Sequence, residues 1–270
     1  MKSVKRTLIA WSSGKDSAWM VHVLRSRPDT ELGGLLTTVN EVAQRAAMHA
    51  VRLELLDAQA DALGLPLRTV PIPSPCPNEV YEQRMAHAVA RAVADGFTHV
   101  AFGDLFLEDV RRYRETRLEG TGLTPLFPLF GSDTTALARE MIAAGLAARL
   151  TCVNPAVLDP SFAGREFDAR LLAELPAHVD PCGERGEFHT FAYRGPMFHR
   201  PIPVTPGAVV ERDGFVFADL LPERLRPCRG PQGGSRAGVA CRAEDERLRG
   251  EASAPVRAGG GAPAPAKKPE

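Results

Sequence analysis

The residues best suited to chemistry form the loop WSSGKDSAW, residues 11–19, which carries three hydroxyl groups, one ammonium and one carboxylate. It follows an apolar run and precedes an amphipathic stretch, the order of a strand, a loop and a helix. The first amides of a helix have no partner within it, and the positive end of its dipole favours an anion. Gly14 lets the backbone approach that anion closely. The loop therefore predicts a phosphate site, although Ser and Asp also favour helix starts as caps.

The elements around the loop predict an α/β protein. Apolar and amphipathic stretches alternate, which requires crossover connections and a parallel sheet covered on both faces. The expected strands are 7–11, 33–39, 67–72 and 99–104, and the expected helices run from about 17 to 24, 45 to 62, 78 to 94 and up to 117, the second ending at Gly64. Asp104 ends the fourth strand, at the edge where such sheets bind ligands, or caps the helix that comes after it.

The second half of the chain has a different pattern. Residues 151–160 contain two prolines, a short helix is expected over 166–175, and residues 208–221 alternate as a β-hairpin that turns at Asp213 and Gly214. We expect a first domain over 1–150, a smaller C-terminal α+β lobe over 151–228, and a disordered tail over 229–270. The Gly-, Ala- and Pro-rich tail has little to bury.

Charge and composition exclude several classes of protein. Residues 229–270 carry 8 Lys/Arg and 5 Asp/Glu, which leaves 25 and 28 in a mildly acidic body. Nucleic acid favours basic surfaces, so we expect no nucleic-acid partner. No apolar run approaches the ~20 residues of a bilayer span, and the sequence ahead of the loop is unlike a signal peptide, so we expect a cytoplasmic protein without a membrane partner. Five scattered cysteines without a CxxC pair argue against disulfides and structural zinc.

The loop lacks the GxxxxGK[ST] spacing of a Walker loop but resembles the SGGxDS loop of the PP-loop ATP pyrophosphatases. Ser13 replaces the first glycine, so it must adopt a backbone conformation that a side chain tolerates. Other segments are similar to motifs of the diphthine–ammonia ligase family, also called the ATP-binding domain 4 group. They are LLTTVNE at 35–41, AMHAVR at 47–52, FGDLFLEDVRRYRE at 102–115 and CGERGEFHTF at 182–191. The resemblance implies a Rossmann-like sheet of the adenine nucleotide alpha hydrolase type.

The resemblance also implies how ATP and Mg²⁺ are bound. The loop would hold the β and γ phosphates with Mg²⁺, and the end of the second strand with the nearby MH pair would receive the adenosine. The implied ATP-binding residues are Ser12, Ser13, Gly14, Lys15, Asp16, Ser17, Thr37, Thr38, Met48 and His49. Residues 1–150 would then be the PP-loop ATP-binding domain and residues 151–228 the substrate-side lobe.

The two later motifs are assigned to the acceptor side of the cleft. The implied substrate-binding residues are Gly103, Glu108, Arg111, Arg114, Gly186 and Thr190. The implied catalytic residues are Lys15, Asp16, Asp104, Glu184, Glu187 and His189. Without the resemblance, the motif at 102–115 suits a salt-bridged helix face as well as it suits a site. The motif at 182–191 would then be read as a charged turn before a strand.

The implied reaction joins a carboxylate to ammonia. Attack of the carboxylate on the α-phosphate of ATP gives an acyl-adenylate and pyrophosphate, and ammonia then displaces AMP. Positioning and charge neutralisation by the loop, Lys15 and Mg²⁺ would catalyse the first step. The second step needs neutral ammonia, and Asp104, Glu184 or Glu187 could take the proton from ammonium.

The acceptor and the class of protein stay open at this stage. The acceptor is a small-molecule or protein-borne carboxylate. The Ala-, Arg-, Gly- and Pro-rich composition is typical of GC-rich bacterial genomes, and because bacteria are not expected to make diphthamide, only the reaction type would then carry over. A homo-oligomer is allowed for. The alternatives are a PP-loop enzyme that modifies tRNA, against which the acidic body weighs, and an ATP-binding module without catalysis.

Overall fold

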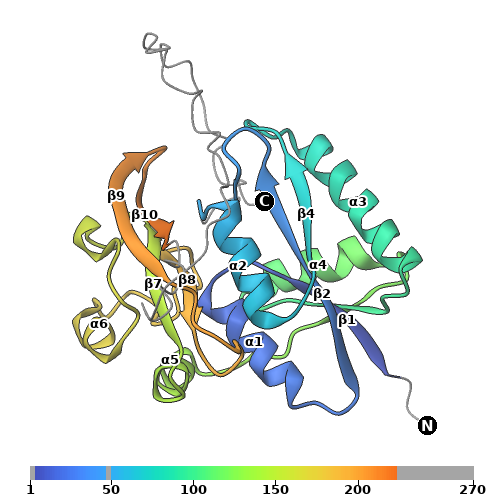
Figure 1. Cartoon of the computed structure of the whole chain (residues 1–270), viewed down its shortest axis with the longest axis horizontal. Coiled ribbons are helices and arrows are strands. Elements are labelled where there is room, and N and C mark those ends of the chain that lie inside the picture. Colours follow the sequence, from blue (N-terminus) through green and yellow to red (C-terminus); the bar gives the residue numbers. More distant parts are fainter. Residues whose placement is uncertain (1–3, 47–49, 224–270) are drawn as a thin grey trace, which may run out of the picture.

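The computed structural model describes residues 4–46 and 50–223. Met48, His49 and the tail expected over 229–270 lie outside the described residues. Within the two described ranges the chain forms two sheets, with helices between and around them (Figure 1). A search of the same ranges finds no helix that is both long enough and apolar enough to cross a membrane.

The larger sheet has six strands and is mainly parallel. Its parallel strands pair in the spatial order β4 (Leu67–Ile72), β2 (Thr30–Asn40), β1 (Lys5–Ala10), β5 (His99–Ala101) and β6 (Thr124–Leu126). The short β3 (Arg45–Ala46) pairs antiparallel with the end of β2. The expected Rossmann-like α/β fold is therefore confirmed.

Helices cover both faces of this sheet. Alternate side chains of β1 point to opposite faces, so the neighbours of two successive residues show which helices lie on each face. Ile9 belongs to the main apolar cluster with side chains of α1 (Lys15–Arg25) and α2 (Leu53–Leu63). Leu8 belongs to a smaller cluster with side chains of α3 (Asn78–Ala94) and α4 (Glu108–Leu118). α2 ends at Gly64, whose φ of 66° gives the expected left-handed helix stop.

The smaller sheet is antiparallel, with the strand order β8 (Phe188–Arg194), β7 (Ala147–Val153), β10 (Phe215–Pro222) and β9 (Val204–Arg212). The helices α5 (Thr134–Ala143) and α6 (Ala169–Glu174), with a short 3₁₀ turn at Pro160–Phe162, connect and flank these strands. In Figure 1, α1 and α2 lie between the two sheets. The smaller sheet thus packs on the helices that come after the first two strands.

Several local expectations are corrected by tertiary contacts. The helix expected from residue 45 begins only at Leu53, because Arg45 belongs to β3. Arg45 and Arg52 both bind the Asp219 carboxylate on β10, at 2.8 Å and 2.6 Å, which ties this segment to the smaller sheet. β5 ends at Ala101, so Asp104 lies in the loop after it. The hairpin is confirmed, with Asp213 and Gly214 at positive φ.

Candidate functional site

The loop after β1 is held by three groups from more distant parts of the chain. Gln59 on α2 donates from Nε2 to the Ser13 carbonyl at 3.0 Å, and the Ala192 amide on β8 donates to the same carbonyl at 2.9 Å. The Thr190 hydroxyl on β8 accepts from the Lys15 amide at 3.1 Å. The N-cap residue of α1, Gly14, makes no side-chain hydrogen bond to the first turn. The Thr190 hydroxyl therefore caps the helix from the smaller sheet. The shape of the loop therefore depends on both sheets.

Ser13 keeps the backbone shape that a glycine would have at this position. Its φ is 70°, in the left-handed region, which a side chain can enter only at a cost of about 1–2 kcal/mol. Its side chain is fully buried, and among the described residues its hydroxyl has no hydrogen-bond partner. The expectation of a backbone conformation that a side chain readily tolerates is therefore wrong, because Ser13 has the left-handed φ that favours glycine.

Gln59 is a residue of the site that the sequence patterns did not single out. It is fully buried, and its side-chain amide also donates to the Ala192 carbonyl at 2.6 Å and accepts from the Trp11 indole at 3.0 Å. Its hydrogen bonds thus connect α2 to the loop after β1, at Trp11 and Ser13, and to β8, at Ala192. A signal was present, since a glutamine stands among the apolar positions of the stretch LELLDAQADAL.

The loop after β5 touches the start of α1. A methyl group on the Cα of Gly103 would lie 3.2 Å from the Asp16 carbonyl carbon and 3.2 Å from the Ser17 amide nitrogen. Any side chain here would push the two segments apart. A close backbone approach therefore accounts for Gly103 without a ligand.

Lys15 directs its side chain into the protein. Only 2% of the side chain is exposed. Its ammonium donates to the Asp16 carboxylate at 2.9 Å and to the Cys182 carbonyl, and it lies 5.4 Å from the ring centres of Phe167 and Phe188. Burial alone would lower the pKa of Lys15, but the neighbouring acidic groups, Asp16 first, outweigh it and raise that pKa. The ammonium is therefore charged and already paired within the protein.

The two carboxylate oxygens of Asp16 differ in their hydrogen bonding. Oδ2 accepts from Lys15, whereas Oδ1 is buried and has no hydrogen-bond partner among the described residues. A buried carboxylate oxygen without a partner is costly unless a ligand completes it. Asp16 lies in the first turn of α1, in the same loop-to-helix segment as the Ser12 and Ser17 hydroxyls, which are 3.1 Å apart.

Glu184 links the smaller lobe to the loop after β5. Its Oε1 accepts from the Leu105 amide at 2.8 Å. Burial, opposed by this hydrogen bond and supported by the charges of Asp16 and Asp104, raises the pKa of Glu184 to about 7. These interactions bring the three predicted acidic residues into one neighbourhood, with the carboxyl of Glu184 titrating near neutral pH.

The remaining polar groups of the 180–187 loop shape the loop itself. Glu187 is buried and accepts from the Asp180 amide at 3.1 Å and from the Arg185 amide at 2.9 Å. The Asp180 carboxylate accepts from the Cys182 amide at 2.9 Å and from the Thr134 hydroxyl at 2.7 Å. The predicted catalytic residue Glu187 thus has both oxygens committed to its own loop.

Two other predicted residues lie at the ends of these segments. Gly186 has a φ of 85°, which favours glycine in the turn before β8. His189 lies on β8, where burial, assisted by the charge of Lys15, lowers its pKa to about 4. The imidazole is therefore neutral around pH 7.

Some residues of the segment after β5 lie at the site, and others lie on the surface of α4. Asp104 accepts two hydrogen bonds from the Arg114 guanidinium, at 2.6 Å and 3.0 Å, and this guanidinium stacks over Phe102. Arg111 instead pairs with Glu115 at 2.9 Å and lies over the rings of Phe127 and Phe130. Glu108 is exposed in the first turn of α4. Asp104 and Arg114 thus reach the site, whereas Arg111 and Glu108 lie on the helix surface.

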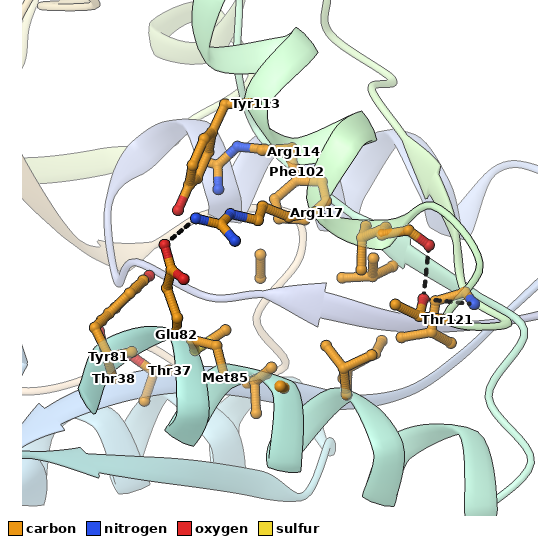
Figure 2. Close-up of a pocket in the computed structure, with 18 of the residues that line it drawn as sticks. Thr37, Thr38, Tyr81, Glu82, Met85, Phe102, Tyr113, Arg114, Arg117 and Thr121 are labelled. Carbon is orange, nitrogen blue, oxygen red and sulfur yellow. Dashed lines mark hydrogen bonds and ion pairs between the residues drawn. The ribbon is translucent and has the colours of Figure 1, made fainter. Parts of the chain in front are cut away.

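A cavity of about 500 Å³ lies between the larger sheet and the helices α3 and α4. Figure 2 shows the cavity, with Thr37, Thr38 and Tyr81 toward one side and Tyr113 and Arg114 toward the other. An ion pair between Glu82 on α3 and Arg117 on α4 crosses the mouth. The deeper walls are apolar and come from β1, β2, β5, α3 and the end of α4. Since its charged groups are paired, the cavity suits a neutral, largely apolar group.

The structure therefore gathers most of the predicted site at the carboxyl end of β1. Ser12 lines the cavity together with Thr37 and Thr38, and the charge of Asp16 acts on Glu184. Among the described residues, no cluster of three or more His, Cys, Asp or Glu side chains could hold a metal by itself.

In this α/β fold the first strand of a mainly parallel sheet leads into a loop and a helix N-terminus suited to an anion, beside an apolar cavity. This arrangement is typical of nucleotide-binding proteins. We call the loop of residues 11–19 the anion-type loop. Two family models match the chain, the diphthamide synthase N-terminal domain over residues 5–124 and the diphthamide synthase C-terminal domain over residues 133–216. Together they cover most of both sheets, ending at the first residue of β6 and the second residue of β10.

Curated proteins give the same family. Diphthine–ammonia ligase from Bos taurus is 28% identical over 236 residues, and that from Homo sapiens 29% over 236 residues, each alignment covering 77% of this chain and 86% of the relative. The enzyme from Danio rerio is 32% identical over 188 residues, 62% of this chain and 71% of its own. The chain belongs to the diphthine–ammonia ligase family.

Proposed function

We propose that this protein forms an amide from a carboxylate and ammonia, with ATP converted to AMP and pyrophosphate. The observation that carries the proposal is the joint placement of the anion-type loop, the unpartnered Asp16 oxygen and the neutral-range Glu184 carboxyl. The family name supports the same reaction. The roles of the individual site residues are part of the proposal.

ATP would lie along the carboxyl end of the larger sheet. The amides at the start of α1 and the hydroxyls of Ser12 and Ser17 would bind the terminal phosphates. The adenosine would enter the cavity mouth beside Thr37 and Thr38, where a neutral aromatic base meets an apolar wall. This arrangement directs the α-phosphate toward the 180–187 loop.

Mg²⁺ fits this site through Asp16. Its Oδ1 is a buried carboxylate oxygen without a partner among the described residues, and carboxylate and phosphate oxygens are the ligands that Mg²⁺ prefers. Asp16 would hold the ion together with the ATP phosphates, and bound Mg²⁺ would neutralise charge on the phosphates. This accounts for the lack of a self-sufficient metal cluster among the described residues.

Glu184 is the base that we propose for the ammonia step. A carboxylate with a pKa of about 7 is partly ionised at neutral pH and can accept a proton from ammonium. Glu187 has less capacity for this role because its two oxygens bind backbone amides. Asp104, paired with Arg114, would orient the acceptor side.

The acceptor is a carboxylate on a small molecule or on a protein. The named relatives are diphthine–ammonia ligases, and diphthine is the acceptor in an organism that makes it. We place the reaction in the cytoplasm.

The thiol chemistry of a sulfur-transferring tRNA enzyme receives no support. Burial raises the pKa of Cys152 and of Cys182 to about 12, so both thiols are protonated at neutral pH. An ATP-binding module without catalysis is separated from a ligase by its products.

The test is an assay of AMP and pyrophosphate release from ATP·Mg²⁺ with a carboxylate pool from a cell extract, with and without ammonium. The wild type should form both products in equal amounts, and Asp16→Ala should lower the rate by about 100-fold or more. Asp57→Ala, a matched carboxylate loss on the exposed face of α2, should leave the rate unchanged. ATP binding without either product would favour the non-catalytic module.

A further inference from the structure

Lys15 stands at the contact between the two lobes, and its environment differs from that of a phosphate ligand. The residue belongs to the first turn of α1, yet most of its side-chain partners come from residues 167–188 of the smaller lobe. A ligand in the cavity or above the loop would have to draw the ammonium out of a site where 2% of the side chain is exposed.

The partners of the ammonium compensate its burial. A buried charge is stable only when it is paired and hydrogen-bonded. The Asp16 carboxylate supplies the counter-charge, the Cys182 carbonyl a second acceptor, and the faces of Phe167 and Phe188 a cation–π environment. Every feature of this environment favours a cation that stays in place.

The Cys182 carbonyl is a significant anchor point because Glu184 lies only two residues further along the same loop. Glu184 is fixed at its other side by the Leu105 amide at 2.8 Å. Between these points the loop is tied internally, since the Asp180 carboxylate accepts from the amides of Cys182 and Glu184. Lys15 and Leu105 therefore hold the two ends of the segment that carries Cys182 and Glu184, and Thr134 on α5 holds the loop at a third point, the Asp180 carboxylate.

We propose that Lys15 is a positioning residue whose buried ammonium fixes the 180–187 loop, and with it the Glu184 carboxylate, against the loop after β1. The role of Glu184 in turnover rests on the proposed function, whereas the anchoring of the loop does not.

The experiment compares Lys15→Met with Lys5→Met in the full-length chain. Lys5 also forms an ion pair, at 2.7 Å with Asp29, but its side chain is 36% exposed and lies at the far end of β1. The first measurement is amide hydrogen exchange without ligand, resolved for residues 180–187 and for β4 as an internal reference. The second is the dissociation constant of ATP·Mg²⁺, and the third is the rate of AMP formation.

For Lys15→Met we expect exchange over 180–187 to accelerate by about 10-fold or more while β4 keeps its rate, because the anchor at Cys182 is lost. The dissociation constant of ATP should change by less than about 3-fold, and AMP formation should fall by about 10-fold or more, the pattern of lost positioning rather than lost binding. Lys5→Met should leave all three values near those of the wild type.

A loss of ATP affinity beyond about 10-fold would overturn the proposal, whatever the exchange rates, since it would make the ammonium a phosphate ligand. Unchanged exchange over 180–187 would overturn it equally. If Lys15→Met does not fold, Lys15→Gln keeps a hydrogen-bond donor without the charge and is judged by the same two criteria. A wild-type protein that binds no ATP would refute the proposed function alone, because the exchange measurement still decides the anchoring.

Discussion

Helices α1 and α3 flank the same candidate site but are built in opposite ways. α1 buries seven of its 11 residues and is tied at its start to β8, α2 and the 180–187 loop. α3 buries one of its 17 residues and stands over a cavity, joined to α4 at the mouth by an exposed ion pair. The comparison teaches that the phosphate side of the site is preorganised, whereas the side that would receive the base can adapt.

The largest expected effect comes from Gln59→Leu, which attacks the rigid side. It leaves the Ser13 carbonyl, the Ala192 carbonyl and the Trp11 indole with fewer or no partners in a buried site. We expect the free energy of unfolding to fall by about 4 kcal/mol, since each unsatisfied buried group costs about 1–3 kcal/mol. Denaturant titration measures it. Gln83→Leu on the exposed α3 is the control. Equal losses of unfolding free energy in the two variants would contradict the difference proposed between the two sides of the site.

The next effect concerns pH and Glu184. A carboxyl whose pKa is raised to about 7 on folding binds a proton more tightly in the folded state, so stability is lost as pH rises from about 4.5 to 7. His189, with a pKa lowered to about 4, has the opposite sign between about pH 4 and 6.5. Glu184→Gln isolates the contribution of Glu184, because glutamine does not titrate. Between about pH 4.5 and 7, the wild type should lose about 2 kcal/mol of unfolding free energy relative to the variant. A difference that does not depend on pH would contradict the burial of this carboxyl.

Ser13→Gly should stabilise the protein by about 1 kcal/mol, because it relieves the left-handed strain and removes a buried hydroxyl, against the entropy cost of a glycine. Thermal unfolding measures the change. Asp213→Gly is matched in φ, at 53°, but sits in an exposed hairpin turn with no buried hydroxyl, so its effect should be near zero. Destabilisation by Ser13→Gly would mean that the hydroxyl has a structural role.

The smallest effect is expected on the adaptable side. Glu82→Gln breaks the ion pair across the cavity mouth, and because both side chains are more than 40% exposed, the loss should be below about 0.5 kcal/mol. Amide exchange in α3 should nevertheless accelerate relative to α1. Glu115→Gln removes a comparable exposed pair within α4 and should leave α3 unchanged. A loss above about 2 kcal/mol would place this helix among the rigid parts of the site.

Much of the architecture could be predicted because it is written in local patterns. The alternation of strands and helices, the stop at Gly64 and the turn at Asp213 and Gly214 each depend on neighbours in sequence. The direction of the Lys15 side chain could not be predicted, because its partner Cys182 lies 167 residues away. The same holds for Arg45, which contacts Asp219 and belongs to a strand in place of the expected helix.

The most direct test of the account is a crystal structure of the full-length chain with Mg²⁺ and a non-hydrolysable ATP analogue. The account predicts the terminal phosphates at the loop of residues 12–17, the ion on Asp16 Oδ1, the base between β2 and α3, and the Lys15 ammonium still on the Cys182 carbonyl. A nucleotide whose phosphates lie away from this loop, or whose base lies outside the cavity, would contradict it.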